Sequence, residues 1–476
     1  MRSSRAQQAV LVIALVACLV KGLVMARITP PFQTPDEYGH YDYVLYLSYI
    51  DWARFLAGDV ARPTGYNDIT TEELWAVTRA TGTESHLRGQ GLARPLPSLS
   101  AQIAGGATFV PTDTHEQLRT RTVVPPQFNY PILYYGVAAV LVKGVRVFTA
   151  NPVVAYHVVR MTSLLLILLT VYLVWRLAVF HFEGWVPPAL AAAFVALQPQ
   201  LGLLGTSVQS DVLTIALTTL AGVLAIRYAE VPGLTRSAAL GLVIAALLLT
   251  KVHAAAAVVV AVTAVIAWVQ RTRGVRAVLS HLVIAGAVAS LGLWWYVRAY
   301  VLYGSATGMV GDFRTAQFAG RRQNIRAWLA QWRNTVESFW GVWGWLEIAL
   351  PRAWYDLLGG AYVVSLVPLV TAPRSASLYA RHASAIVFWA TLTIAYTLVM
   401  AVVAALVGPV HNNQGRHWLP LVAVPALLLA AAGAALERRS RVPGWVLLAA
   451  WCVLLTATNA GLVRAALAFY AGIPHP

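Results

Sequence analysis

The chain of 476 residues has little charge and almost no cysteine. Only 11% of its residues are charged, whereas an average soluble domain has roughly 25%. A chain with so few charges cannot cover a soluble globule with polar surface. Its two cysteines, Cys18 and Cys452, both lie within apolar runs, which excludes a disulfide framework.

Nucleotide and metal motifs are also missing from the sequence. There is no glycine-rich phosphate loop, which argues against a nucleotide-driven mechanism. There is no cluster of histidine and cysteine with zinc spacing, so we predict no metal-ligating residues.

The net charge of +16 would suggest nucleic acid as the partner of a soluble protein. Here the basic residues cluster in short loops between apolar runs, which is the positive-inside pattern of membrane proteins. A second reading is attraction to anionic lipid headgroups. We therefore expect membrane lipids, and no nucleic acid, as partners. The basic groups are Arg2 and Arg5, Arg271 to Arg276, Arg374 to His382, and Arg438 to Arg441.

Apolar runs of about 20 residues recur along the chain, and each is long enough to cross roughly 30 Å of hydrocarbon. We therefore predict an all-α polytopic membrane protein with about 11 transmembrane helices, in a range of roughly 10 to 13. The basic N-terminus is expected in the cytoplasm.

The same pattern divides the chain into five parts. We expect a cytoplasmic N-terminus with the first transmembrane helix, a large extracytoplasmic loop with interfacial helices, a transmembrane core, a second extracytoplasmic loop and the C-terminal transmembrane helices. In order, these parts are residues 1–27, 28–128, 129–302, 303–355 and 356–476.

One feature of this topology conflicts with the charges. The basic loop from Arg271 to Arg276 predicts that residues 303–355 lie outside, but counting every apolar segment as a full crossing would place them inside. One pair of segments is therefore expected to be short, kinked or re-entrant, flanking either Lys251 or residues 198–211. Broken backbone at membrane depth is tolerated where it is buried or lines a cavity, so a cavity is expected there.

Acidic residues are concentrated in the first loop, where 11 of the 19 lie between Ile28 and Phe128. Thr34, Pro35 and Glu37 have the spacing of a helix N-cap box. Asp36 and His40 lie one helical turn apart on one face. A carboxylate held at a membrane surface in a partly desolvated site can act as a general base. Both readings, a cap and a catalytic group, stay open.

Further polar residues lie at the ends of apolar segments. Asp211, Lys251 and Arg298 are ionisable groups within apolar sequence, which favours a functional role. The alternative for the two cations is that their side chains extend to the membrane interface.

Two more segments carry candidate binding residues. Gln414 and Arg416 begin an apolar segment on the outer side, and the planar fork of Arg416 suits a phosphate. Trp340 belongs to a tryptophan-rich stretch from Trp328 to Trp345, which is either an interfacial aromatic belt or an apolar platform for a lipid tail or a sugar ring.

Taken together, these features resemble the membrane glycosyltransferases of the GT-C fold. The chain is most similar to a bacterial family of that group that is catalogued as a domain of unknown function and often accompanies genes for cell-surface polysaccharide. The order and spacing of the short motifs carry the resemblance over nearly the whole chain. These motifs are Pro-Asp-Glu-x-x-His at 35–40, the tyrosine-rich 129–135, Ser-Val-Gln-Ser-Asp at 207–211, Leu-Thr-Lys at 249–251, Ser-Phe-Trp-Gly at 338–341 and Gln-Gly-Arg at 414–416.

The resemblance implies an inverting transferase at the extracytoplasmic face of the bacterial plasma membrane. It would move a sugar from a polyprenyl-phosphate donor to a cell-envelope glycan or lipid acceptor. Asp36, or Glu37 in its place, would deprotonate the acceptor, while Lys251, Arg298 and Arg416 would bind the lipid phosphate. Oligosaccharyl transferases of this fold use a divalent metal and many relatives do not, and the sequence gives only weak support for one here.

Two positions depart from the family pattern: His417 stands where tyrosine is expected, and Gln209 where asparagine is more common. Two other functions compete with the transferase. A polysaccharide or lipid transporter would typically contain inverted repeats, and the sequence has no internal repeat. A non-catalytic partner in a cell-envelope complex is the third reading.

Overall fold

The computed structural model describes residues 4–59, 71–83, 97–120, 130–306, 321–371, 376–407, 414–439 and 443–471. Within these ranges the regular structure is helical, with a single isolated bridge between Trp343 and Ile348. The predicted all-α class is therefore confirmed.

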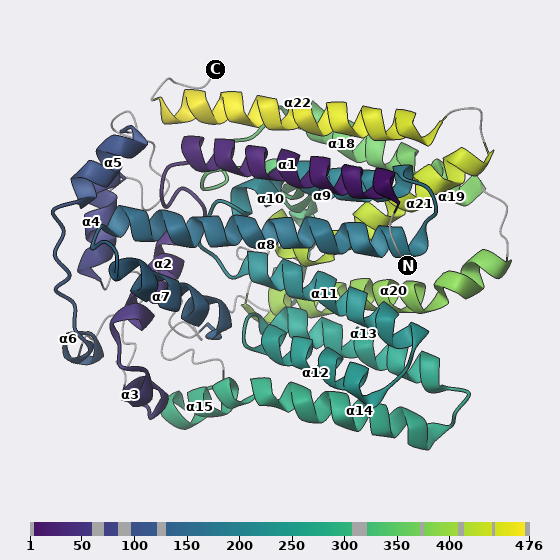
Figure 1. Cartoon of the computed structure of the whole chain (residues 1–476), viewed down its shortest axis with the longest axis horizontal. Helices are drawn as coiled ribbons and strands as arrows, with labels where there is room; N and C mark the ends of the chain where they lie inside the picture. Colours follow the sequence, from purple (N-terminus) through teal and green to yellow (C-terminus); the bar gives the residue numbers. More distant parts are fainter. Residues whose placement is uncertain are drawn as a thin grey trace.

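Long helices lie roughly parallel to one another along the longest dimension of the molecule (Figure 1). They are α1 (Arg5–Ile28), α8 (Pro152–His181), α9 (Val186–Leu197), α11 (Asp211–Glu230), α12 (Leu234–Leu248), α13 (Val252–Gln270), α14 (Val275–Ala289), α18 (Arg352–Ser365), α20 (Ala376–Val407), α21 (Ala423–Arg439) and α22 (Gly444–Tyr470).

Local sequence explains where two of the long helices begin. At α8, the side chain of Asn151 accepts hydrogen bonds from the backbone N–H groups of Val153 and Val154, and Pro152 occupies the first turn. At α1, Ser4 and Gln7 form a reciprocal capping box.

Apolar side chains fill the core and also cover the outer faces of the helices. In α1, Val12, Ile13, Val16 and Val20 are all more than half exposed. Such a surface is stable against lipid and not against water. With the apolar length of the helices, it makes this chain a multi-pass membrane protein.

Eight helices of the described residues are long and apolar enough to cross a membrane. A ninth is obtained if the 3₁₀ helix η5 (Gly415–Leu421) and α21, which are bent by 58°, form one span. The expected number of about 11 is not confirmed. Two further apolar helices, α9 and α12, are shorter than the roughly 20 residues of a straight span.

The topological conflict predicts a short, kinked or re-entrant segment beside Lys251 or residues 198–211, and the short helices α12 and α9 lie next to those two places. Another short segment lies at 130–147, near the start of the expected transmembrane core. The structure forms only the 14-residue α7 (Leu133–Arg146) there. It is not among the candidate spans, and it packs against the short α2 (Glu37–Tyr49).

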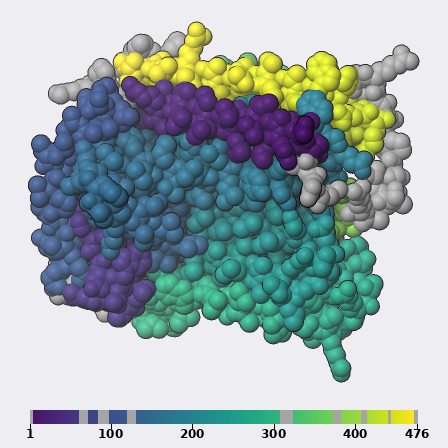
Figure 2. All heavy atoms as spheres, viewed as in Figure 1, coloured from purple at the N-terminus to yellow at the C-terminus, as the bar shows by residue number. Residues whose placement is uncertain are grey.

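Short helices gather at one end of the long ones, at the left in Figure 1. Figure 2 shows the blue part of the chain at that same end, whereas the darkest purple helix, α1, runs along the upper side of the molecule. These helices are α2, α3 (Trp52–Leu56), α4 (Glu72–Thr81), α5 (Leu99–Gly106), α6 (His115–Thr120), α7 and α15 (Trp294–Tyr303). The remaining elements are α10 (Pro199–Leu204), η2 (Ser290–Gly292), α16 (Arg321–Ala330), α17 (Trp332–Gly341) and α19 (Val367–Thr371).

Two expectations for the first loop are corrected by this arrangement. The helical periodicity and the aromatic residues of 38–56 predict one amphipathic helix along the membrane surface. Instead these residues form α2 and α3 with a break at Ile50 and Asp51, and α2 is buried on nearly all sides. The Gly, Pro and Ser content of residues 89–111 predicts an irregular connection, but α5 lies within their described part.

Helices α12 and α14 approach closely at a glycine. A Cβ atom on Gly241 would lie 2.3 Å from the carbonyl oxygen of Ala285 and 2.9 Å from Cβ of Val288. Between membrane helices, where lipid is as apolar as the side chains, such close backbone contact is a main source of attraction.

We expect Gly241→Ala to separate these helices and to lower the free energy of unfolding by about 1–3 kcal/mol. Gly286→Ala in α14 is the matched control, because nothing lies within 4 Å of its Cβ position. That change should be neutral or stabilise the helix by up to about 1 kcal/mol. Unfolding of both variants in detergent, followed by circular dichroism, measures the difference. Equal stabilities would contradict the close packing.

Candidate active site

A buried ion pair joins three chain segments beneath the candidate site. Glu37, the first residue of α2, and Arg160 of α8 are both inaccessible to solvent, and Arg160 Nε lies 3.5 Å from Glu37 Oε1. The Arg160 guanidinium also donates to the carbonyl oxygens of Thr29 and Thr206. The pair therefore holds the end of α1 against the loop before α11.

The Glu37 carboxylate accepts three further hydrogen bonds. The backbone N–H of Phe32 donates to it over 3.1 Å, the backbone N–H of Val208 over 3.0 Å, and the Tyr156 hydroxyl over 2.8 Å. A carboxylate with so many donors is satisfied in place and has no face open to a substrate. These contacts give Glu37 a structural place in the fold, and its role as an alternative base stays a prediction.

The predicted capping box is wrong. Helix α2 begins at Glu37, its N-cap residue is Asp36, and Asp36 makes no side-chain capping bond. The hydroxyl of Thr34 is buried with no hydrogen-bond partner among the described residues. The box fails because Glu37 turns inward to Arg160, while Asp36 has a left-handed backbone with φ 66°.

Asp36 points away from Glu37 and meets Arg416. Arg416 Nη2 donates to Asp36 Oδ2 over 2.7 Å, and its other terminal nitrogen, Nη1, donates to the carbonyl oxygen of Pro35 over 2.9 Å and to Gln209 Oε1 over 3.2 Å. The Arg416 side chain is 6% exposed, whereas that of Asp36 is 48% exposed. A fixed, buried cation thus stands behind an accessible carboxylate.

Another ion pair lies close to that of Asp36 and Arg416. Lys251, between α12 and α13, donates to Asp211 at the start of α11, and both side chains are largely buried. Arg416 also interacts electrostatically with Asp211. The charges of Asp36, Arg416, Asp211 and Lys251 therefore form one cluster, and all four are candidate site residues of the sequence analysis.

His40 lies beside this cluster as a neutral group. Its Nδ1 is hydrogen-bonded to the Tyr135 hydroxyl at 2.7 Å, and Tyr135 donates to Ser210 Oγ over 3.4 Å. Burial lowers the pKa of His40 to about 4, although the charge of Asp36 acts in the opposite direction. At neutral pH His40 therefore supplies a hydrogen-bonding group and no charge.

The pKa values of the two adjacent carboxyls, Asp36 and Glu37, are shifted in opposite directions. Partial burial disfavours the charge of Asp36, but the charge and the hydrogen bond of Arg416 outweigh it and hold the pKa of that carboxyl below its ordinary value. At Glu37 burial dominates and raises the pKa of the carboxyl, even though Arg160 acts to lower it. Asp36 is thus the one ionised over the wider pH range.

Three predicted site residues lie elsewhere or stay without a described contact to the cluster. Arg298 donates to the carbonyl oxygen of Phe55 over 2.5 Å and its guanidinium lies 4.4 Å from the centre of the Phe55 ring, so it anchors α3. Trp340 is 4% exposed and stacks on Trp451, so it belongs to the core and offers no platform. Gln414 precedes η5, and its side-chain oxygen is buried with no described partner.

Sequence reasoning missed Arg160 as a site residue. Its signal was present, since it is an ionisable residue inside an apolar run, the same criterion that selected Asp211 and Lys251. Tyr134 and Tyr156 were also missed as individual groups. Tyr134 accepts a hydrogen bond from the backbone N–H of Gln209 over 3.0 Å, and Tyr156 donates to Glu37. A buried tyrosine hydroxyl near an apolar helix has no distinctive sequence pattern.

The described side chains of the cluster do not assemble a divalent-metal site. In the described part of the chain, no three His, Cys, Asp or Glu side chains come together as a metal site would need. The carboxylates of Asp36 and Asp211 each hold a cationic side chain instead. The mechanism proposed below therefore has no metal-dependent step.

Replacing Glu37 should test the buried pair. In Glu37→Ala the charged Arg160 would stay buried without its partner, which typically costs about 3–5 kcal/mol of stability. We expect a large fall in melting temperature in detergent. The control is Asp356→Asn, which changes an exposed carboxylate paired with Arg333 on the surface and should leave the melting temperature nearly unchanged. A similar melting temperature for Glu37→Ala and Asp356→Asn would rule out the structural role of Glu37.

Known structures and families were compared with the chain. No curated protein matches the sequence. A solved oligosaccharyltransferase of Archaeoglobus fulgidus, in complex with zinc and sulfate, matches 98% of this chain and 53% of its own, at 13% identity and a TM-score of 0.43. The archaeal oligosaccharyltransferase AglB from the same organism, in complex with an inhibitory peptide and a dolichol-phosphate, matches 97% of this chain and 56% of its own, at 12% identity and a TM-score of 0.39. The chain spans about half the length of these two structures, and likenesses this distant carry no argument here.

The sequence profile of a family described as "Predicted membrane protein (DUF2142)" matches residues 19–425, which include every residue of the charged cluster. This confirms the resemblance to a family of unknown function that the short motifs indicated. The chain belongs to the DUF2142 family of membrane proteins.

Proposed function

We propose that this protein is a GT-C type glycosyltransferase. It moves a sugar from a polyprenyl-phosphate donor to a cell-envelope glycan or lipid acceptor, at the extracytoplasmic face of the bacterial plasma membrane. The observation that carries the proposal is the accessible carboxylate of Asp36, held against the buried cation Arg416 and close to a second cation, Lys251.

The reaction needs few protein groups. The acceptor hydroxyl loses its proton to a carboxylate oxygen of Asp36, and the acceptor oxygen bonds to the anomeric carbon of the sugar. The bond from that carbon to the donor phosphate oxygen breaks, and polyprenyl phosphate leaves with the electron pair. Attack opposite the leaving group inverts the anomeric configuration. Because the donor is already activated, the enzyme has to position the reactants, remove a proton and stabilise the phosphate.

Arg416 is built for the last of these tasks. Its Nη1 is held by two acceptors, and its Nε is buried with no partner in the described part of the chain. A phosphate oxygen would satisfy this nitrogen in a site of low dielectric, where the interaction is strong. A phosphate that shares the guanidinium with Asp36 would also weaken the hold on the carboxylate and make it a stronger base.

The charge distribution supports an extracytoplasmic site. The loop between α13 and α14 contains Arg271 and Arg273, and it lies at the end of the long helices opposite the short helices (Figure 1). Basic loops stay in the cytoplasm, which favours the outer side for Asp36 and its neighbours.

Asp36→Asn should lower the transfer rate by roughly 10²- to 10⁴-fold, since a general base contributes about that factor. The assay incubates purified protein with a panel of polyprenyl-phosphate sugars and measures release of polyprenyl phosphate. Asp356→Asn is the control, because Asp356 pairs with Arg333 on the surface, outside the cluster. Normal transfer by Asp36→Asn would exclude Asp36 as the base. If the wild type moves lipid-linked sugar across the membrane of vesicles but transfers no sugar to an acceptor, the result would favour a transporter.

The pH dependence of transfer should identify the group further. A base must be deprotonated, and Arg416 holds the pKa of Asp36 below its ordinary value, so the rate should stay level as pH falls from neutral and decline only below the ordinary pKa range of an aspartate. In Arg416→Gln the pKa of Asp36 should rise, which moves the acid limb to higher pH. The measurement is the rate from pH 3.5 to 8 for both proteins, roughly spanning the ordinary carboxyl and imidazole range. An unmoved limb would show that Arg416 does not control the titrating group.

A further inference from the structure

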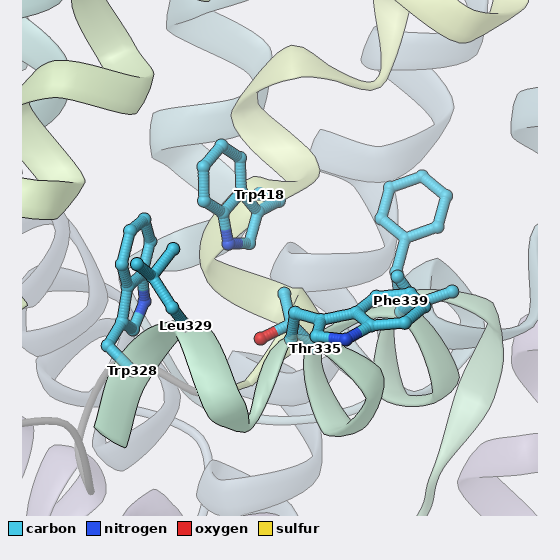
Figure 3. A pocket seen from close by; sticks show the side chains of 7 residues that line it. Trp328, Leu329, Thr335, Phe339 and Trp418 are labelled. Atoms are coloured by element: carbon cyan, nitrogen blue, oxygen red, sulfur yellow. The ribbon is translucent and has the colours of Figure 1, made fainter. Parts of the chain in front are cut away.

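An apolar cavity lies beside the charged cluster and is not used by the chemistry described above. Its volume is about 340 Å³, and its lining is almost wholly apolar. Helices α16 and α17 form one side and η5 the other, as Figure 3 shows with Trp328, Phe339 and Trp418. Trp332, Leu329 and Val336 complete the apolar wall.

The wall of the cavity is rigidly joined to Arg416. Trp418 follows Arg416 by two residues in the same 3₁₀ helix. Just before Arg416, Gly415 lies so close to α17 that a Cβ atom would be 1.9 Å from the backbone nitrogen of Phe339. The N–H of Gly415 also donates to the Ser338 hydroxyl over 2.7 Å. The position of the cavity relative to the cation is therefore set by backbone contacts.

The cavity is open to the outside of the molecule. Trp332 is 61% exposed and Leu329 57% exposed, although both line it. Tryptophan and leucine side chains in such a position keep favourable contacts when they meet lipid or a ligand tail. An anion-binding group at one end and an open apolar cavity at the other fit an amphiphile with a phosphate head and a hydrocarbon tail.

We propose that this cavity binds the isoprene units nearest to the phosphate of the polyprenyl donor. The inference takes the class of donor from the proposed function. It adds which part of that donor the protein binds specifically. A volume of about 340 Å³ is at the lower end of the range for ligand pockets, so only a short part of a polyprenyl chain fits. The remainder of the chain lies in the bilayer and makes no specific contact with the cavity.

The test measures binding to the full-length protein in detergent by native mass spectrometry, without any turnover. The probes are farnesyl phosphate, undecaprenyl phosphate and straight-chain pentadecyl phosphate. We expect similar affinity for the short and the long isoprenoid, and weaker binding of pentadecyl phosphate. Trp332→Ala should weaken both isoprenoids by roughly tenfold, because it removes a large apolar contact.

Trp445→Ala is the matched control. Trp445 is also an exposed tryptophan, at 53%, but it lies in the first turn of α22, away from the cavity. Its replacement should leave all affinities unchanged. Because both tryptophans are on the surface, neither substitution should prevent folding, and equal melting temperatures will verify this.

Three results would overturn the assignment of the cavity. These are much tighter binding of undecaprenyl phosphate than of farnesyl phosphate, equal binding of pentadecyl phosphate, or unchanged affinities in Trp332→Ala. If the wild type binds the isoprenoid phosphates but Trp332→Ala has no effect, only the cavity is misassigned and the proposed donor stands. If the wild type binds none of them, the proposed donor class fails together with the cavity.

Discussion

The buried pair of Glu37 and Arg160 is the constraint on which the candidate site depends. Removing two charges from solvent is costly, and the cost is offset only where the remaining hydrogen-bonding capacity is used. Here the carboxylate has three donors besides Arg160, and the guanidinium has two carbonyl acceptors besides Glu37. The partners come from the end of α1, from α8 and from the loop before α11, so the pair fixes three segments that are distant in sequence.

The direction of Asp36 follows from this constraint. With Glu37 held inward, the chain enters α2 through Asp36, whose backbone is in the left-handed region. This backbone conformation is unfavourable for residues other than glycine and persists only where the surrounding structure imposes it. This backbone turns the carboxylate of Asp36 to Arg416, which is 380 residues further along the chain. One acid is thereby buried in the fold, and its neighbour stays accessible beside a buried cation.

The composition of the chain and the proposed activity fit each other. A protein whose surface is mostly apolar side chains can retain the tail of a lipid substrate at little cost, while its few charges are kept for the phosphate and the acceptor hydroxyl. In the proposed function, the cavity lined by Trp418 takes the lipid tail and Arg416 takes the phosphate, and both residues belong to the short segment from Gly415 to Trp418.

Sequence alone determined the all-α membrane class, the family, and the residues Asp36, Asp211, Lys251 and Arg416 as candidates, because ionisable groups are rare and costly in apolar sequence. The tertiary structure decided which of them meet. In the structure Glu37 is buried against Arg160, which sequence reasoning had missed. Arg298 contacts α3, and Trp340 packs in the core. The segment at 130–147 forms the short helix α7 in place of an expected crossing. Local patterns report the chemistry of a side chain and the period of a helix. They contain no information on the partner that a charge finds hundreds of residues away, and that partner determines whether the charge supports the fold or faces a substrate.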